Sequence, residues 1–299
     1  MPSDMPRRVS AAELIVADLP PREAILDPIL ATKSLVLLYG PRGLGKTFIA
    51  LGIAWAAASG GSFLNWQAPT PRRVLYVDGE MAAVDMKERL RLLGSAPPTL
   101  EFMLADMNAG SPPDLATFEG QSRLTASWGH PDLVVLDNLS SLAGFKNGDP
   151  DSWNDLQRFL MLQRRFGRAM LLVHHANKKG LQRGTNRRED VLDVVMSLRR
   201  PDDYAPRQGA RLEIHFEKAR GLHGDAVDPI EARLETDTVG VARWTWRKIG
   251  MPDLDRAASL LNEGKGPVEI ARMLGFSPAK AYRLRDHARK AGLLVEAAS

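Results

Sequence analysis

Eight residues near the start of the chain, Gly40 to Thr47 (GPRGLGKT), constrain its fold more than any other segment. They follow a five-residue apolar run, Leu35–Tyr39, and precede small and apolar residues that read as a helix, Phe48–Ala58. A glycine-rich turn between a buried strand and a helix brings backbone N–H groups and the helix dipole to one point, where they can surround a polyphosphate. The spacing therefore predicts a phosphate-binding loop.

The residue types within this loop suit a bound nucleoside triphosphate. Gly40 and Gly45 shape the loop, while Lys46 reaches the β- and γ-phosphates. Thr47 offers its hydroxyl to Mg²⁺. An ordinary glycine turn is the alternative, and the strand-loop-helix setting argues against it. We expect ATP and Mg²⁺ as ligands, with nucleotide contacts from Gly40, Pro41, Arg42, Gly43, Leu44, Gly45, Lys46, Thr47 and Phe48.

Composition limits the classes of protein that this chain can be. Its 299 residues, 44% of them hydrophobic and 25% charged, suffice for one sizeable α/β domain and a small appendage. The sequence has no cysteine, which excludes disulfides, thiolate-bound zinc, iron–sulfur clusters and a cysteine nucleophile. The chain start lacks an apolar signal region, and no run approaches about 18 apolar residues, so we expect a cytoplasmic protein with no membrane span. A net charge of +4 permits nucleic-acid binding without establishing it.

Short apolar runs alternate with helical patterns until about Ile249, after which the strand pattern stops. Runs that are apolar throughout are typical of strands buried on both faces, so we expect a mostly parallel sheet and leave the later strands open to antiparallel pairing. We therefore expect a lead-in at 1–32, an α/β domain at 33–250 and a small all-α domain at 251–299. The expected strands are Leu35–Tyr39, Arg73–Val77, Leu133–Asp137, Met170–His174, Val194–Arg199, Arg211–Lys218 and Ala242–Trp246.

Carboxylates follow two of the expected strands. A bound nucleotide needs a carboxylate to order Mg²⁺ and its waters, and Asp137 ends the buried run DLVVLDN as a Walker B aspartate does. An aspartate that only caps a turn is the alternative. Hydrolysis also requires a group that positions the attacking water. The run RVLYVDGEM supplies Asp78 and Glu80 for that role.

Taken in order, these segments resemble the RecA-like ATPases, and most closely the RepA-type hexameric plasmid helicases. The resemblance extends from Lys33 to Ile249 and rests on GPRGLGKT, VDGEM, VVLDN, LLVHHANKKG, RGTNRRED and FEKARG. It implies a RecA-like P-loop NTPase core that works as a homo-oligomeric ring, a hexamer, with single-stranded DNA in its channel. RecA-like ATPases keep their catalytic glutamate on the strand adjacent to the loop, whereas many P-loop classes place it next to the Walker B aspartate. Since Asn138 follows Asp137, the resemblance implies Glu80 as the base.

The run MLLVHHANKKG ends in His174 and His175, where the family keeps a polar residue that contacts the γ-phosphate. The sequence does not distinguish the two histidines. A histidine satisfied at a strand end and a metal-binding pair are the alternatives, and the lack of an H-E-x-x-H spacing argues against metal.

Basic residues follow in two places where the family binds DNA or a neighbour's nucleotide. The loop NKKGLQRGTNRRED lies where RecA-like motors carry a channel-facing loop, which implies DNA contacts from Lys178, Lys179, Arg187 and Arg188. In FEKARG, Lys218 and Arg220 fall on one side of a continuing strand. In the family such a pair acts on the neighbouring subunit's nucleotide as an arginine finger, with Arg183 as the rival finger. A solvated loop and an intramolecular surface pair are the alternatives.

The segment from Asp253 to Leu294 reads as three helices. A turn at Gly275 precedes Ser277 as N-cap and Pro278 at the first helical position. The last helix is strongly basic, as expected of a helix that faces phosphates or a DNA groove. Ala271, Leu274, Ala281 and Leu284 have the apolar spacing of a helix-turn-helix core, and the stretch resembles small resolvase-like or regulator-type DNA-binding modules. That implies duplex-DNA contacts from Ala279, Lys280, Tyr282 and Arg283, with a protein-docking module as the alternative.

Two functions fit these features. The first is a ring-forming ATP-dependent DNA helicase or translocase that serves replication of a mobile element. The second is an ATP-switched DNA-binding regulator or adaptor, which the helix-turn-helix favours because RepA-type helicases need no such module. A small-molecule kinase is weaker, since no lid-like arginine segment accompanies the loop.

Overall fold

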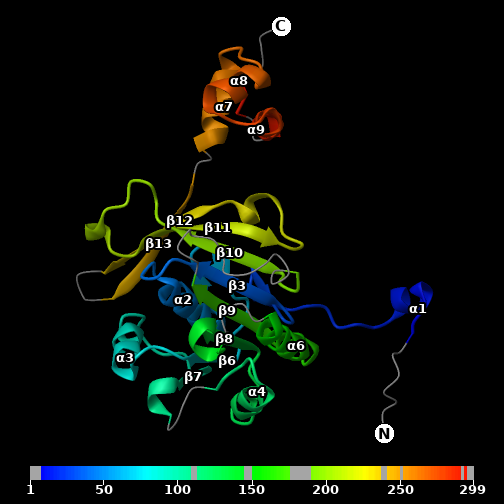
Figure 1. Cartoon of the computed structure of the whole chain (residues 1–299), viewed down its shortest axis with the longest axis vertical. Coiled ribbons are helices and arrows are strands. Elements are labelled where there is room, and N and C mark those ends of the chain that lie inside the picture. The colour runs from blue at the N-terminus through cyan, green and yellow to red at the C-terminus, as the bar shows by residue number, and fades with distance from the viewer. Residues whose placement is uncertain are drawn as a thin grey trace. The chain divides into compact units, whose positions relative to one another are not determined.

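The computed structural model describes residues 8–108, 113–144, 150–175, 190–236, 241–249, 252–290 and 293–294. The chain divides into two compact units, Met1–Trp246 and Arg247–Ser299. Figure 1 shows the first as an α/β unit built around one sheet and the second as a group of helices. Among the described helices, none is long and apolar enough to cross a membrane.

A nine-stranded sheet forms the centre of the first unit, with the strand order β13-β12-β11-β10-β3-β9-β8-β6-β7. The six strands from β10 to β7 in that order pair in parallel, and β11 returns antiparallel to both β10 and β12. The strands are β3 (Leu35–Gly40), β6 (Val74–Asp78), β7 (Leu100–Leu104), β8 (Leu133–Asp137), β9 (Ala169–His175), β10 (Val194–Arg199), β11 (Arg211–Ala219), β12 (Ile230–Thr236) and β13 (Ala242–Lys248).

The mostly parallel sheet and all seven expected strands are confirmed. Two strands of the sheet, β7 and β12, were not expected from the sequence. One expectation is wrong: the strand that precedes Glu80, β6, is not adjacent to β3, because β9 and β8 lie between them. The sheet order reflects how crossover helices pack, and chain order alone does not reveal it.

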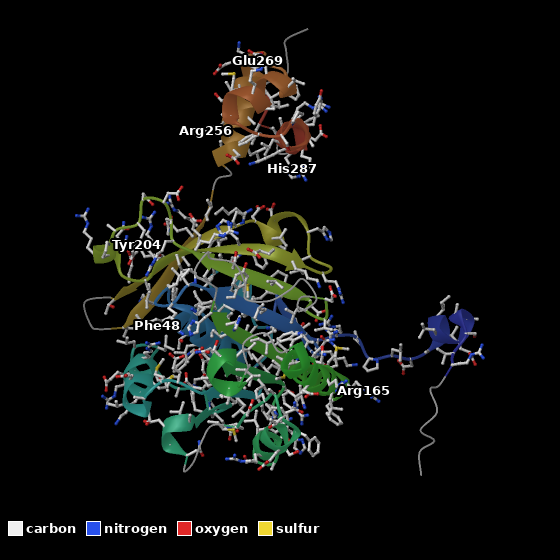
Figure 2. All side chains as sticks on the ribbon, in the orientation of Figure 1. Phe48, Arg165, Tyr204, Arg256, Glu269 and His287 are labelled. Carbon is white, nitrogen blue, oxygen red and sulfur yellow. The ribbon has the colours of Figure 1, made fainter. Side chains whose placement is uncertain are left out.

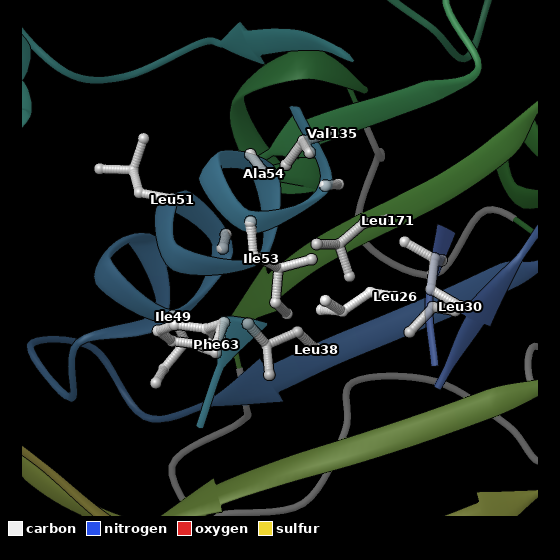
Figure 3. Packing of buried hydrophobic residues seen from close by; sticks show 14 of the residues in the cluster. Leu26, Leu30, Leu38, Ile49, Leu51, Ile53, Ala54, Phe63, Val135 and Leu171 are labelled. Carbon is white, nitrogen blue, oxygen red and sulfur yellow. The ribbon is translucent and has the colours of Figure 1, made fainter. Parts of the chain in front are cut away.

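Helices cover both faces of the sheet (Figure 1). On one face α2 (Lys46–Ser59) packs with α3 (Ala83–Arg91), and on the other lie α4 (Phe118–Thr125), α5 (Leu139–Leu142) and α6 (Pro150–Arg165). Figure 3 shows Ile49 and Ile53 of α2 against Leu38, Val135 and Leu171 of three strands. Each such side chain, fully removed from water, stabilises the fold by about 1.5–3 kcal/mol.

Residues before β3 belong partly to this core and partly to an exposed arm. The hairpin of β1 (Ala24–Leu26) and β2 (Leu30–Ala31) packs Ile25 and Leu26 into the cluster beneath α2. The structure thus makes residues 24–31, expected in the lead-in, part of the first unit, with Ile25, Leu26, Ile29 and Leu30 in its core. The short α1 (Ala11–Val16) has no buried residue. A second hairpin joins β4 (Ser62–Phe63) and β5 (Trp66–Gln67).

The second unit consists of α7 (Pro252–Asn262), α8 (Pro267–Leu274) and α9 (Pro278–Lys290). Its small core includes Leu254 from α7, Ile270 from α8 and Leu284 from α9. Gly275 ends α8 in the left-handed conformation, with φ of 69°, which favours glycine. Ser277 Oγ accepts a hydrogen bond from Lys280 N at 3.3 Å, so it caps the start of α9 as expected.

Candidate active site

The glycine-rich loop connects β3 to α2 at the carboxyl end of the parallel strands. Gly45 has φ of 101° and precedes the first residue of α2, and this backbone conformation is accessible to glycine at little cost. The first N–H groups of α2 have no partners within the helix and point toward the loop, as anion binding requires. The local pattern of the sequence therefore forms the expected turn between a strand and a helix, with a geometry suited to binding an anion.

Lys46 begins α2 and is 5% exposed. Its Nζ donates hydrogen bonds to the carbonyl oxygens of Gly40 at 3.0 Å and Pro41 at 2.7 Å. Burial lowers the pKa of Lys46 to about 8, although the nearby Asp137 and Glu80 charges oppose that shift. The ammonium group is thus held inside the loop, where phosphate oxygens can replace the two carbonyls.

Asp137 ends β8 and is 4% exposed. Its Oδ2 accepts a hydrogen bond from the hydroxyl of Tyr76 at 2.7 Å. Burial raises the pKa of Asp137 to about 6, while the hydroxyl groups of Tyr76 and Thr47 oppose the shift. The structure thus brings together the two side chains expected to hold Mg²⁺, and both supply oxygen atoms.

Glu80 lies two residues beyond the end of β6. Asp78, level with Asp137 on the neighbouring strand, accepts hydrogen bonds from the backbone N–H groups of Glu80 at 2.9 Å and Met81 at 2.6 Å. This tight turn directs Glu80 toward the loop. Asn138 Nδ2 donates a hydrogen bond to Glu80 Oε2. Glu80 therefore reaches the site across the end of β8, although its own strand is not adjacent to β3.

The two histidines at the end of β9 differ in environment. His175 pairs in register with Gly40, the first residue of the loop, and its Nε2 lies 3.6 Å from Glu80 Oε2. His174 is 5% exposed and is not among the residues that line the cavity beside the loop. Burial, together with the charge of Lys46, lowers the pKa of His175, so its ring is neutral at pH 7. Within the described residues, no group of three or more His, Cys, Asp or Glu side chains is placed to hold a metal.

Lys46, Glu80, Asp137 and His175 line one cavity of about 550 Å³. Other lining residues carry no recognisable signal in the sequence. Arg200, just after β10, donates from Nη2 to the carbonyl of Gly43 at 3.2 Å and lies 3.8 Å from the ring of Tyr204. On the α3 side, the Arg89 guanidinium lies 4.6 Å from the ring of Phe48. Figure 2 labels Phe48 and Tyr204, which lie on the same side of the first unit.

Lys218 and Arg220 converge, as their spacing predicts, but away from this cavity. Lys218 Nζ and Arg220 Nη2 both donate to the carbonyl of Asp190, at 3.3 and 3.2 Å. Backbone bonds connect Arg220 to Asp193 and Asp193 to Leu35, at the amino end of β3. The loop follows the carboxyl end of β3, five residues or about 16 Å away. The pair therefore does not reach the phosphate loop of its own chain.

The basic residues expected to contact single-stranded DNA, and the rival finger, lie outside the described residues. They are Lys178, Lys179, Arg183, Arg187 and Arg188.

On α9, three of the four residues expected to contact duplex DNA are exposed: Ala279, Tyr282 and Arg283. Lys280 instead forms an ion pair with Asp253 of α7 at 2.6 Å and lies 3.8 Å from the ring of Phe276. Lys280 therefore helps to hold the three helices together, and its charge is already partly neutralised.

Comparison with known sequences identifies the first unit. A sequence profile described as AAA domain matches residues 2–180, more than half of the chain. The chain belongs to the AAA domain family. This family consists of P-loop ATPases, which accounts for the phosphate loop of the chain. Membership of the family also implies that the chain binds ATP. No curated protein matches the sequence.

Solved structures with the same arrangement include a KaiC-like protein from the hyperthermophilic archaeon Pyrococcus horikoshii. It is 15% identical in sequence, with a TM-score of 0.51, and the match covers 73% of this chain and 93% of that one. The flagellar accessory protein FlaH from Methanocaldococcus jannaschii is 11% identical, with a TM-score of 0.48, over 72% of this chain and 90% of that one. The first similarity shows that the AAA domain of this chain has a RecA-like fold.

Proposed function

We propose that the chain hydrolyses ATP in the cavity beside the phosphate loop, with Glu80 as the base that orients the attacking water. The convergence of Lys46, Glu80 and His175 in one cavity carries this proposal. Lys46 neutralises the β- and γ-phosphates, and backbone N–H groups at the start of α2 hold their remaining charge. Glu80 is 65% exposed at its side chain, so water has access to its carboxylate.

Thr47 and Asp137 are the residues that would hold Mg²⁺. This hydroxyl and this carboxylate line the same cavity and supply the oxygen donors that this ion takes beside substrate phosphates. When bound, Mg²⁺ offsets negative charge on the phosphate oxygens. The Tyr76 hydroxyl fixes the Asp137 carboxylate in orientation, so the donor pair is set before the nucleotide enters.

His175 is the better candidate for contact with the γ-phosphate. It lies level with Gly40 and beside Glu80, and its neutral ring can donate one hydrogen bond to a phosphate oxygen. Departure of the γ-phosphate would free that donor to bond to the Glu80 carboxylate, which lies 3.6 Å away. This exchange would report hydrolysis to β9 and to the loop after it.

We further propose that Lys218 and Arg220 act on the nucleotide of a neighbouring copy in a homo-oligomeric ring. Their location two strands away from β3 favours a role between subunits, because neither side chain lines the cavity beside its own phosphate loop. A cation contributed by a neighbour would stabilise the charge that develops on the transferring phosphoryl group. Turnover would then require assembly.

DNA is the substrate that we propose for such a motor, and replication of a mobile element is the process. The basic character of residues 176–189 and the excess of positive charge on α9 support nucleic-acid binding. In this account the single strand passes through the ring and ATP hydrolysis drives its movement or unwinding.

The second unit favours another candidate function, an ATP-switched regulator that recognises a DNA site. Ala279, Tyr282 and Arg283 project from the early turns of α9 and are exposed. A helix that presents side chains in this way fits the major groove of a duplex. Such a protein would hydrolyse ATP without processive unwinding.

ATP hydrolysis by the full chain, measured with single-stranded DNA, with duplex DNA and without DNA, separates the two candidates. Protein concentration is varied across the assembly range in each case. The motor predicts strong stimulation by single strands and unwinding of a forked duplex. Turnover that ignores single strands but changes with particular duplexes would contradict the motor and support the regulator. Lys46→Ala serves as the turnover-deficient control.

A further inference from the structure

Tyr39 lies in β3, directly before the phosphate loop. It is 3% exposed and packs in the apolar cluster on the sheet face opposite α2. Its hydroxyl donates a hydrogen bond to Glu217 Oε2 of β11 at 2.5 Å, across the intervening β10. Ser197 of β10 pairs in register with Tyr39, and its small side chain leaves room for the ring to cross that strand. The strand that leads into the phosphate loop is thus bound to the strand that carries Lys218.

Glu217 is the extra residue of a β-bulge. Val195 of β10 pairs with Lys218, whereas the next residue, Met196, pairs with Phe216, so Glu217 is inserted between the two pairs. Met196 and Phe216 pack in the cluster beneath α2, and Val195 packs in the cluster on the opposite face. Directly paired residues of neighbouring strands share a face. Lys218, the partner of Val195, therefore lies on the face opposite α2.

This bulge decides which face of the sheet carries the two cations. Successive side chains of a regular strand point to opposite faces, so without the extra residue Lys218 and Arg220 would lie on the face that packs against α2. A slip of one residue in register moves every following side chain to the other face. With Glu217 inserted, both cations lie on the face of Tyr39, where they donate to the carbonyl of Asp190.

Two side chains hold the Glu217 carboxylate. The Tyr39 hydroxyl donates to Oε2, and Arg199 Nη2 donates to Oε1 at 3.1 Å. Although burial favours the neutral acid, hydrogen bonds that include these two lower the pKa of Glu217, so the carboxylate is charged at pH 7. The Arg199 side chain is 54% exposed, and water can take its place at little cost. Tyr39 donates from a buried position, so its bond is the one that fixes the bulge.

We propose that Tyr39 and Glu217 are positioning residues whose hydrogen bond holds the bulge in the register that presents Lys218 and Arg220 to a neighbouring copy's nucleotide. This inference rests on the proposed role of the two cations as a finger. β3 is buried along its whole length, so it gives a fixed reference for cations that must meet a phosphoryl group outside their own chain. Without the hydroxyl the bulge can shift, and a small displacement of a charge aimed at the reacting group slows the reaction strongly.

Mixed assemblies test which partner needs the Tyr39 hydroxyl. A Lys46→Ala chain supplies only the finger and an Arg220→Ala chain supplies only the ATP site, so phosphate release by their mixture comes from shared sites. Tyr39→Phe removes only the hydroxyl and is placed in one chain or the other. We expect release to fall about tenfold when the finger-supplying chain carries it, and to stay largely unchanged when the site-supplying chain does. Arg199→Ala in the finger-supplying chain takes the exposed donor from the same carboxylate and should change release little.

A second substitution tests whether the two residues act through one bond. Glu217→Ala in the finger-supplying chain should lower release as much as Tyr39→Phe does, and the two together should lower it no further, because both break the same hydrogen bond. Thermal unfolding of each full chain shows that it is folded. Losses that multiply, equal losses from Tyr39→Phe in either chain, or no loss from either placement would overturn the proposal.

The mixture without these substitutions separates this inference from the proposed function. Lys46→Ala and Arg220→Ala chains that regain no activity together would refute the shared site itself, and the positioning role with it. Recovery in that mixture, with Tyr39→Phe harmless in the finger-supplying chain, would refute the positioning role alone.

Discussion

Glu80 Oε2 lies 3.6 Å from His175 Nε2, although the two residues come from strands that are not neighbours. Asn138, at the end of the intervening β8, also contacts the Glu80 carboxylate. The three side chains form a row across the carboxyl ends of β6, β8 and β9. This row places the proposed base beside the proposed phosphate sensor, so we expect a change in the position of one to alter the position of the other.

Alanine substitutions distinguish the roles of the two histidines. His175→Ala removes a side chain that lines the cavity, and we expect turnover to fall at least tenfold with little change in melting temperature. His174→Ala leaves a gap in a buried strand, so we expect a lower melting temperature and largely retained turnover. Steady-state ATP hydrolysis and thermal unfolding on both variants test this. A catalytic defect in His174→Ala alone would reverse the assignment.

ATP affinity should depend on pH through Lys46. Burial lowers the pKa of Lys46 to about 8, so the amine loses its charge as pH rises through that value. We expect the dissociation constant for ATP to rise by up to about tenfold per pH unit above 8. Titration of a fluorescent ATP analogue between pH 7 and pH 9.5 measures this. Lys46→Ala should bind weakly at every pH, and a flat wild-type profile to pH 9.5 would argue against the assignment.

Asp137 should lower stability at neutral pH. Its folded-state pKa of about 6 lies above the ordinary value of 3.8, so stability decreases as pH rises through this interval and the buried carboxyl ionises. At pH 7 we expect the free energy of unfolding of Asp137→Asn to exceed that of wild type by on the order of 1–3 kcal/mol. At pH 4 we expect little difference between the two. Urea unfolding at both pH values provides the measurement. The variant should also lose Mg²⁺-dependent turnover, and a variant less stable than wild type at pH 7 would contradict this reading.

Sequence patterns identified the central strands because their residues are apolar throughout. β8 and β10 begin and end at the expected residues. β7 was missed because Glu101 interrupts its apolar run and the strand forms a half-exposed edge. An edge strand needs less burial and so leaves a weaker pattern in the sequence. β12 lies between β13 and β11 and alternates apolar and charged residues, which is the pattern of a strand with one solvated face, so the sequence did carry a signal for it.

The residues of the candidate site likewise divide into those that the sequence predicts and those that only the fold reveals. The phosphate loop is a contiguous pattern, so spacing alone located Lys46 and Thr47. Arg200 contacts Gly43 across 157 positions of sequence, and such a contact arises only from the pairing of β10 with β3. The distinction between His174 and His175 likewise depended on strand register, because neighbouring residues of a strand face opposite sides.

Mixed assembly tests the proposed finger. We expect Arg220→Ala and Lys46→Ala each to be inactive alone and to regain part of their activity when mixed. In a mixed ring some sites combine an intact Lys46 with an intact Arg220 from the neighbour. Phosphate release across a range of mixing ratios measures this. Arg199→Ala, which removes a neighbouring surface cation paired with Glu217, should remain active alone. Absence of any recovery, or full activity of Arg220→Ala by itself, would rule out a shared site.

Single-turnover phosphate release by Glu80→Gln, with ATP binding measured on the same samples, tests the central claim most directly. The substitution keeps the size of the side chain and removes only the carboxylate charge, whereas Glu88→Gln does the same on the exposed side of α3 as a control. We predict that Glu80→Gln binds ATP as tightly as wild type and releases phosphate at least 10²-fold more slowly. Wild-type release rates in Glu80→Gln would contradict the account and require another base.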